Sequence, residues 1–208
     1  PLNMLLALGG GPIATIGDLK GKRIGYSVGG FEDALLKTIL GTAGLGLGDV
    51  ELVNVNFALA QSLLAGNADA VIGAYRNYEL NILDIQGKTA QPFFVEDYGV
   101  PSYDELIFVA NRDKAAAPVM ARFLRAVERG VAFTINQPEA AWGHFIGHRA
   151  ELNDELNSRA FKGTLNRFAH ATAASDPVRY EAFARYLKDQ GLIQTARPAA
   201  DYLVRPQT

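Results

Sequence analysis

The residues whose types could do chemistry are a tyrosine and a glutamate four positions apart, Tyr75 and Glu79, with Tyr78 beside them. On a helix this spacing would place Tyr75 and Glu79 on one face. A carboxylate accepts hydrogen bonds from an amino group, and a phenol ring gives a flat wall on which an aromatic ligand stacks. The pair would suit an aminopyrimidine. The spacing alone equally fits a surface helix with one buried tyrosine and a solvated glutamate.

A glycine pair, Gly29-Gly30, separates an apolar run at 23–28 from a segment at 31–40 with apolar residues at helical spacing. The change of period predicts a strand before the pair and a helix after it. Backbone N–H groups at such a turn can bind an anion or a polar ligand, although glycines also simply allow a tight turn. The sequence has no full GxGxxG and no GxxxxGK[ST], so a nucleotide-binding loop is not predicted. Glu32 and Asp33 would repel a phosphate, which favours a neutral or weakly polar ligand.

Signatures of catalysis are absent from the sequence. His144 and His148 have a spacing that can bind zinc, but no HExxH motif surrounds them, so we expect ordinary, partly buried histidines. The chain has no cysteine, which removes disulfides, thiolate metal sites and cysteine nucleophiles. Ser27 and Ser62 lack a GxSxG setting, and Trp142 has the spacing of a core residue. We therefore expect no enzyme, no metal and no cofactor.

Composition limits the class of protein further. The 208 residues are 49% hydrophobic and 20% charged, which is typical of a folded chain that can bury a core. A net charge of −2 argues against a nucleic-acid binder, which needs a basic face. No apolar run approaches the roughly 18 residues of a membrane span. Residues 2–8 are apolar but lack the flank and length of a signal peptide, and we expect a strand there.

The pattern along the chain is α/β in its first half and helical in its second. Strands are predicted at 2–8, 23–28, 50–55, 68–73, 91–96 and 104–111. Helices are predicted at 31–40, 59–65, 75–85, 116–136, 138–147, 154–168 and 176–190.

Residues 22–74 give the order strand, helix, strand, helix, strand, which predicts a parallel sheet with right-handed crossovers. Ligands of such sheets lie beyond the carboxyl ends of the strands. We therefore expect the loops at 27–31, 54–57 and 73–75 to make the pocket.

The long helical part predicts two lobes, because helices after a last strand must pack on something else. Residues 22–103 would form a second α/β lobe. Residues 1–21 and 104–208 would form parts of a first lobe, with strands at 2–8 and 104–111, together with the C-terminal helices. Two crossings, near Lys20 and Tyr103, would join the lobes.

Several consecutive blocks resemble one family. DLKGKRIG at 18–25 resembles the crossing into the second lobe of periplasmic substrate-binding proteins of the nitrate, sulfonate, taurine and thiamine-precursor type. GYSVGGFE at 25–32, DVELVNVNF at 49–57, DAVIGAYRNYELN at 69–81 and GVPSYDELI at 99–107 are similar to the branch that binds thiamine pyrimidine precursors. The resemblance covers nearly the whole chain and is closest over 18–111.

The resemblance implies a periplasmic-binding-protein-like (type II) fold of two α/β lobes, and the solute-binding component of an ABC importer. It would close on a formylaminopyrimidine- or hydroxymethylpyrimidine-like ligand and deliver it to a permease, in the periplasm or another extracytoplasmic space. Tyr75 would be the stacking wall and Glu79 the acceptor for the amino group. The expected ligand-binding residues are Tyr75, Glu79, Tyr78, Ser27, Gly29, Gly30, Phe31, Asn56 and Tyr103. Family members carry further residues ahead of Pro1, so we expect part of the first lobe, and half of the pocket, to be missing here.

Three alternatives stay open. A related binder of sulfonate, taurine, nitrate or another aromatic solute would use an arginine or open helix N-termini for an anion, whereas the candidate here is a glutamate. The fungal pyrimidine synthase resembles these binders and acts on its own histidine, but its cysteine-rich iron motif is absent. A sensor or docking module on the same fold is the third.

Overall fold

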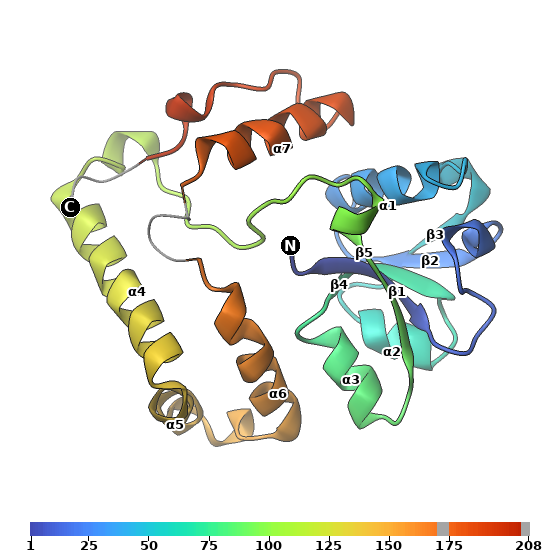
Figure 1. The fold of residues 1–208 in the computed structure, drawn as a ribbon, viewed down its shortest axis with the longest axis horizontal. Coiled ribbons are helices and arrows are strands. Elements are labelled where there is room, and N and C mark those ends of the chain that lie inside the picture. Colours follow the sequence, from blue (N-terminus) through green and yellow to red (C-terminus); the bar gives the residue numbers. More distant parts are fainter. Residues whose placement is uncertain (170–174, 205–208) are drawn as a thin grey trace. The chain divides into compact units, whose positions relative to one another are not determined.

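The computed structural model describes residues 1–169 and 175–204. The chain divides into two compact units, of which the first holds residues 1–105 and 183–196 and the second holds 106–182 and 197–208. Figure 1 gives the elements of both. Each unit is described by itself.

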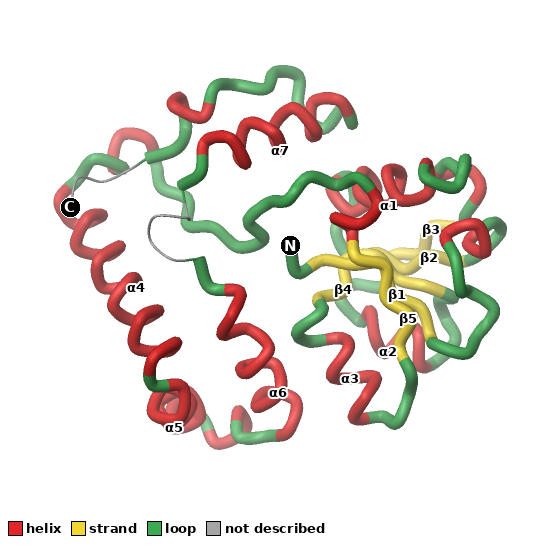
Figure 2. The backbone as a smooth tube through the Cα atoms, viewed as in Figure 1, coloured by secondary structure: helices red, strands yellow, loops and turns green. Residues whose placement is uncertain are grey.

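The first unit is built on one five-stranded mixed sheet with the strand order β3-β2-β4-β1-β5 (Figure 2). Its strands are β1 (Asn3–Leu8), β2 (Arg23–Tyr26), β3 (Glu51–Asn54), β4 (Ala70–Tyr75) and β5 (Ala90–Phe94). Strand β2 pairs in parallel with β3 and with β4, while β1 is antiparallel to both β4 and β5. The predicted strand–helix–strand–helix–strand order with parallel strands is confirmed.

Helices cover both faces of this sheet. Helix α1 (Phe31–Gly41) lies on one face, and α2 (Leu59–Leu64) and α3 (Glu79–Ile85) lie on the other (Figure 1). Side chains alternate along β1, so Leu5 and Ala7 pack with α1 while Met4 and Leu6 pack with α2 and α3. Two apolar layers result, one on each side of the sheet.

The C-terminal part of helix α7 (Pro177–Asp189) also belongs to the first unit. From Phe183 onward it contributes Phe183, Tyr186 and Leu187 to the layer over α1. The Tyr186 hydroxyl lies 2.8 Å from Thr38 Oγ1 and donates to the Ala34 carbonyl at 3.1 Å. These bonds fix α7 against α1.

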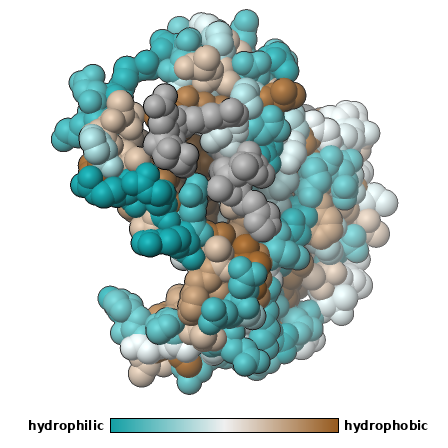
Figure 3. All heavy atoms as spheres, turned by 60° about the vertical axis from the view of Figure 1, so that its left-hand side comes forward, coloured by the Kyte–Doolittle hydropathy of each residue, from teal (hydrophilic) through white to brown (hydrophobic). Residues whose placement is uncertain are grey.

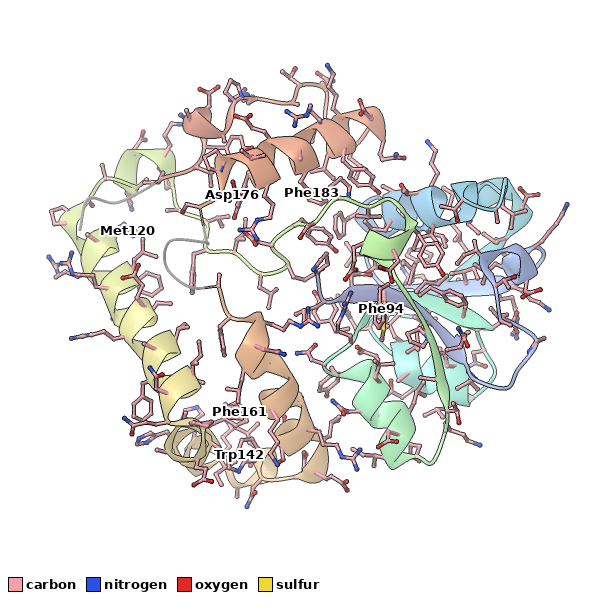
Figure 4. The ribbon with its side chains drawn as sticks, viewed as in Figure 1. Phe94, Met120, Trp142, Phe161, Asp176 and Phe183 are labelled. Carbon is pink, nitrogen blue, oxygen red and sulfur yellow. The ribbon has the colours of Figure 1, made fainter. Side chains whose placement is uncertain are left out.

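The second unit is helical over its described residues. It contains α4 (Pro118–Asn136), α5 (Pro138–His148), α6 (Glu155–Thr164) and the beginning of α7. Proline opens α4, α5 and α7, where its missing N–H is not needed. The ring centroids of Trp142 and Phe161 lie 5.3 Å apart (Figure 4). The ring of Phe145 also packs on Trp142, at 5.6 Å between centroids. Trp142 is thus a packing residue, as its spacing predicts.

Three predictions about the elements are wrong. Strand β1 is hydrogen-bonded between β4 and β5, so residues 1–21 belong with 22–103 and not with the helical part. Residues 104–111 form no strand in the structure, because none of the described segments pairs with them. Tyr75 ends strand β4 and is not on a helix, since α3 begins only at Glu79.

Apolar side chains stay on the surface of the second unit. Leu106, Ile107, Phe108 and Val109 are all exposed, and so is Phe123 of α4, against whose ring Phe108 packs edge-on at 5.2 Å. Figure 3 shows hydrophobic atoms reaching the surface beside hydrophilic ones. Among the described residues, no helix is long and apolar enough to cross a membrane.

Candidate functional site

The loops after β2, β3 and β4 meet at one edge of the sheet, as the parallel order requires. The Phe57 N–H donates to Ser27 Oγ at 3.2 Å, which ties the loop after β3 to the loop after β2. Gly30 has a φ of 84° and donates its N–H to Asp33 at the start of α1. The glycine pair therefore makes the tight turn that the sequence predicts.

The loop after β3 is strained. Asn56 and Phe57 both have positive φ, 48° and 67°, a region that bulky residues rarely occupy. The Phe57 side chain is 75% exposed, so burial does not offset this strain. Such strain concentrates at ligand-binding loops. The sequence predicts Asn56 individually as a site residue, and Phe57 only as part of the pocket loop at 54–57.

A buried carboxylate lies under the loop after β2. Glu32, in the first turn of α1, accepts hydrogen bonds at Oε2 from the N–H groups of Ser27 at 2.7 Å and Val28 at 3.1 Å. Burial raises the pKa of the Glu32 carboxyl, while these two bonds act in the opposite direction. From the sequence, Glu32 is expected only to repel a phosphate at the helix start. Its position makes it the group that holds the loop in place.

A β-bulge at Gly73 adjusts the end of β4. Ile72 is opposite Leu5 and Ala74 is opposite Met4, so Gly73 is an extra residue with a φ of 96°. A Cβ at Gly73 would lie only 2.6 Å from Cδ of Glu32. The position therefore requires glycine for its backbone and for its contact.

The bulge determines which way Tyr75 points. Ile72 packs on the α1 face and Ala74 on the opposite face. In a regular strand, residues 72 and 74 would share a face, and Tyr75 would face α2. With the extra residue, Tyr75 pairs with Asn3 and shares the α1 face with it. This places the phenol ring on the same side as Glu32.

Glu79 closes the turn between β4 and α3. Its Oε2 accepts the Tyr75 N–H at 2.6 Å, and burial raises the pKa of its carboxyl while hydrogen bonds from the backbone lower it. The predicted pair is thus brought together, but through the tyrosine backbone and not through two side chains on a helix face. Tyr78, just before α3, is exposed.

Tyr103 is more deeply buried than the other predicted ligand-binding residues. It is 6% exposed, stacks on Phe183 with centroids 4.5 Å apart, and meets Phe31 edge-on at 5.8 Å. Its hydroxyl donates to Glu105 Oε1 at 2.9 Å, and burial followed by the Glu105 charge raises its pKa. Phe183 is labelled on α7 in Figure 4. Tyr103 and Phe31 support the site from the aromatic layer below it.

The edge of the sheet is rich in acceptors. Burial raises the pKa of the Tyr75 phenol to about 12, and the carboxylates of Glu105, Glu32 and Glu79 add to the shift in that order. Arg76, the residue after Tyr75, interacts with other groups: it pairs with Glu96 at 2.8 Å and lies over the Phe94 ring at 4.2 Å. This chemistry favours a ligand with N–H donors or positive charge over an anion.

Of the predicted site residues, Ser27, Gly29, Gly30, Asn56, Tyr75 and Glu79 lie in the loops at this edge or beside them. The predicted histidines lie on α5, where the His144 ring packs on Phe133 at 5.8 Å. No group of three or more possible metal ligands occurs within the described residues.

Comparisons with known proteins identify the family and the fold of the chain. A family model described as NMT1/THI5 like matches residues 1–141. A protein of Haemophilus influenzae named for thiamine biosynthesis is 44% identical over 205 residues, which are 98% of this chain and 65% of the relative. The formylaminopyrimidine-binding protein of Halalkalibacterium halodurans is 34% identical over 158 residues, 75% of this chain and 48% of the relative. A 4-amino-5-hydroxymethyl-2-methylpyrimidine phosphate synthase of Legionella pneumophila is 24% identical over 198 residues, 93% of this chain and 61% of the relative.

The chain therefore spans between 48% and 65% of the length of these relatives. Among solved structures, the periplasmic aliphatic sulphonate binding protein SsuA of Escherichia coli matches with a TM-score of 0.69 at 17% identity, over 99% of this chain and 66% of that one. The alkanesulfonate-binding protein SsuA of Xanthomonas axonopodis matches at 0.63 and 18%, over 96% of this chain and 68% of that one. At such identity the likeness shows the fold, which is that of periplasmic solute-binding proteins.

The predicted fold class is confirmed by these neighbours, and the family by a model that covers more than half of the chain. The chain belongs to the NMT1/THI5-like family.

Proposed function

We propose that the protein binds a thiamine pyrimidine precursor, an amine-bearing heterocycle of the formylaminopyrimidine or hydroxymethylpyrimidine type, at the carboxyl edge of the sheet in the first unit. In this role it is the solute-binding component of an ABC importer and hands the ligand to a permease outside the cytoplasm. The observation that carries the proposal is the acceptor-rich edge, where the Tyr75 phenol lies among the carboxylates of Glu32, Glu79 and Glu105.

Tyr75 and Glu79 have separate tasks in this proposal. The Tyr75 ring, held on the α1 face by the bulge at Gly73, is the wall on which the heterocycle stacks. The Glu79 carboxylate accepts the amino group. Its Oε2 already takes the Tyr75 N–H, but a carboxylate has about four lone-pair positions and retains capacity for a ligand.

The remaining predicted residues shape the edge. Ser27 and the glycine pair present backbone groups from the loop after β2, and Asn56 stands on the strained loop that Ser27 anchors. Phe57, next to Asn56, adds an exposed aromatic ring to this edge.

Relatives named for pyrimidine binding support the ligand class, since one of them is a formylaminopyrimidine-binding protein at 34% identity. A synthase is the second candidate, because synthases named for a hydroxymethylpyrimidine phosphate also belong among the relatives. We favour the binder because the chain has no cysteine with which to hold an iron centre of the synthase kind. In a binder, the ligand is recovered chemically unchanged.

The test is titration calorimetry with hydroxymethylpyrimidine, formylaminopyrimidine, thiamine, taurine and nitrate. We expect a pyrimidine precursor to bind and the two anions not to bind. Glu79→Gln should weaken pyrimidine binding roughly 12- to 150-fold, the range for a hydrogen bond that involves a charge. Glu51→Gln is the matched control, since Glu51 is exposed at the start of β3, at the opposite end of the strand from the loops.

Equal affinity in the wild type and Glu79→Gln would remove Glu79 from the site. Binding of taurine or nitrate in preference to every pyrimidine would replace the proposed ligand class. Mass spectrometry of the recovered ligand separates the binder from the synthase, because a synthase would leave product.

A further inference from the structure

A buried amide oxygen at the same edge of the sheet has no partner. Asn3, the first residue of β1, is 2% exposed, and its Oδ1 accepts no hydrogen bond from any of residues 1–169 and 175–204. Buried polar atoms in folded proteins are paired in the great majority of cases, because an unpaired one loses its bonds to water without replacement. An unpaired acceptor in this position therefore indicates that a bound molecule supplies the hydrogen-bond donor.

The register places this oxygen beside Tyr75. Strand β1 runs regularly, so the Asn3 side chain shares the face of Leu5 and Ala7, which pack toward α1. Directly opposite Asn3 on β4 is Tyr75, which the bulge turns to the same face. The Asn3 side chain is thus directed to the face on which the phenol ring and Glu32 lie.

Several donors close to Asn3 are used for other acceptors, and the Arg76 guanidinium donates to Glu96 at 2.8 Å and reaches the Asn3 backbone carbonyl at 3.5 Å. The N–H groups of Leu2 and Asn3 both donate to Glu105 Oε2, at 2.8 and 3.2 Å. The Tyr103 hydroxyl donates to the other Glu105 oxygen. Every charged group that acts on the Tyr75 hydroxyl is a carboxylate. Asn3 Oδ1 is therefore one more acceptor beside the three carboxylates that surround Tyr75.

We propose that Asn3 is a specificity-determining residue, whose side-chain oxygen accepts a hydrogen bond from an N–H group of the bound heterocycle and so selects amine-bearing ligands over anions and over analogues without the amine. This inference rests on the proposed function for its ligand class, and it adds a contact from β1 that the loops after β2, β3 and β4 do not provide. A purely structural residue at this depth would be apolar, as Leu5 and Leu6 are.

The signature of this role is a separation of stability from affinity. Asn3→Leu removes an unpaired buried oxygen and keeps a side chain of similar length, so the free protein should melt at the same temperature or higher. The same variant should have a weaker preference for amine-bearing ligands, with only the part that Glu79 provides remaining. A structural asparagine would behave in the opposite way, with a lower melting temperature and unchanged selectivity.

The experiment measures affinity by calorimetry, and melting by circular dichroism, for wild type, Asn3→Leu and the control Met4→Leu. Met4 is the next residue of β1 and packs on the other face of the sheet, so its volume-conserving exchange leaves the edge untouched. The probes are hydroxymethylpyrimidine, its analogue without the amino group, and an aminopyridine that is no thiamine precursor. We expect wild type and Met4→Leu to prefer the amino compound over its analogue to the same extent, and Asn3→Leu to show this preference reduced roughly 3- to 10-fold, the range of one neutral hydrogen bond, because the Glu79 contact remains.

The outcomes separate this inference from the proposed function. If Asn3→Leu keeps the wild-type preference, or if no amine-bearing probe binds the wild type, the assignment of Asn3 is overturned. If wild type binds the aminopyridine with a preference that depends on Asn3 and binds no thiamine precursor, the assignment stands while the proposed function falls.

Discussion

Replacing Gly73 by alanine tests the arrangement on which the candidate site depends. The residue has a φ of 96°, and a Cβ there would lie 2.6 Å from Cδ of the Glu32 carboxylate. The backbone conformation alone costs an alanine about 1–2 kcal/mol. Displacing a buried carboxylate that holds two backbone N–H groups adds about 1–3 kcal/mol, the usual range for overpacking. We expect a loss of about 3 kcal/mol in the free energy of unfolding, which in a chain of this size lowers the melting temperature by roughly 6–12 °C.

A second glycine of the same chain separates the two contributions. Gly44 has a φ of 71° and open space where a Cβ would be, so Gly44→Ala carries the backbone cost alone. Urea unfolding followed by circular dichroism should show Gly73→Ala less stable than Gly44→Ala. Hydrogen exchange at the amides of Ser27 and Val28 should become faster only in Gly73→Ala, because those amides lose their acceptor.

A double variant tests the cause. In a Glu32→Ala background the carboxylate is absent, so Gly73→Ala should lower the free energy of unfolding only as much as Gly44→Ala does. The effects of the substitutions at 32 and 73 on the free energy of unfolding should therefore be non-additive. If Gly73→Ala and Gly44→Ala are equally stable, or if the substitutions at 32 and 73 add, the bulge and the carboxylate are not coupled and the account of Tyr75 is refuted.

Two further predictions concern the same edge. Burial raises the pKa of Glu32, so the stability that this carboxyl contributes is fully present below about pH 4.3, the ordinary value for glutamate, and is lost as pH rises through the higher native pKa. In urea unfolding between pH 4 and pH 7, the free energy of unfolding should therefore decline less for Glu32→Gln than for wild type. Equal declines in the two proteins would contradict this prediction. Phe57 has a φ of 67° and an exposed side chain, so Phe57→Gly should raise the free energy of unfolding by about 1 kcal/mol while weakening pyrimidine binding. A variant that is less stable than wild type and binds the pyrimidine as before would show that the loop is not strained for a ligand.

The sequence was sufficient for the parallel part of the sheet. The change of period at Gly29-Gly30, and the two strand–helix units that follow, predict β2, α1, β3, α2 and β4 with errors of a few residues at their ends. It was not sufficient for β1, because an apolar run of this length predicts a strand but carries no information about its neighbours. The same limit explains residues 104–111, whose apolar pattern favours a strand that no described segment pairs with.

The orientation of Tyr75 could also not be predicted from the sequence pattern. A spacing of four residues between Tyr75 and Glu79 is compatible with a helix, and equally with a strand end followed by a turn and a helix. The glycine within the apolar run at 70–75 was a signal, because glycine inside a strand often marks a bulge. Its consequence, a change of face for every following residue, depends on a pairing with β1 that the sequence does not reveal.

Several features that reduce stability in the first unit lie together at one edge of its sheet. Two non-glycine residues with positive φ, an unpartnered amide oxygen and partly or fully buried carboxylates all lie where β2, β3 and β4 end, next to the start of β1. The rest of the sheet has apolar layers on both faces, with Ile24, Leu35 and Ile72 on one and Leu63 and Val71 on the other. A chain selected for stability alone would spread such costs or remove them, since a leucine at position 3 and a glycine at position 57 would each relieve one. The nearby Arg76 pairs with Glu96 and reaches only backbone carbonyls of β1 and its flank, so the carboxylates and the amide oxygen at this edge are the physical reason to expect that a donor-bearing ligand completes it.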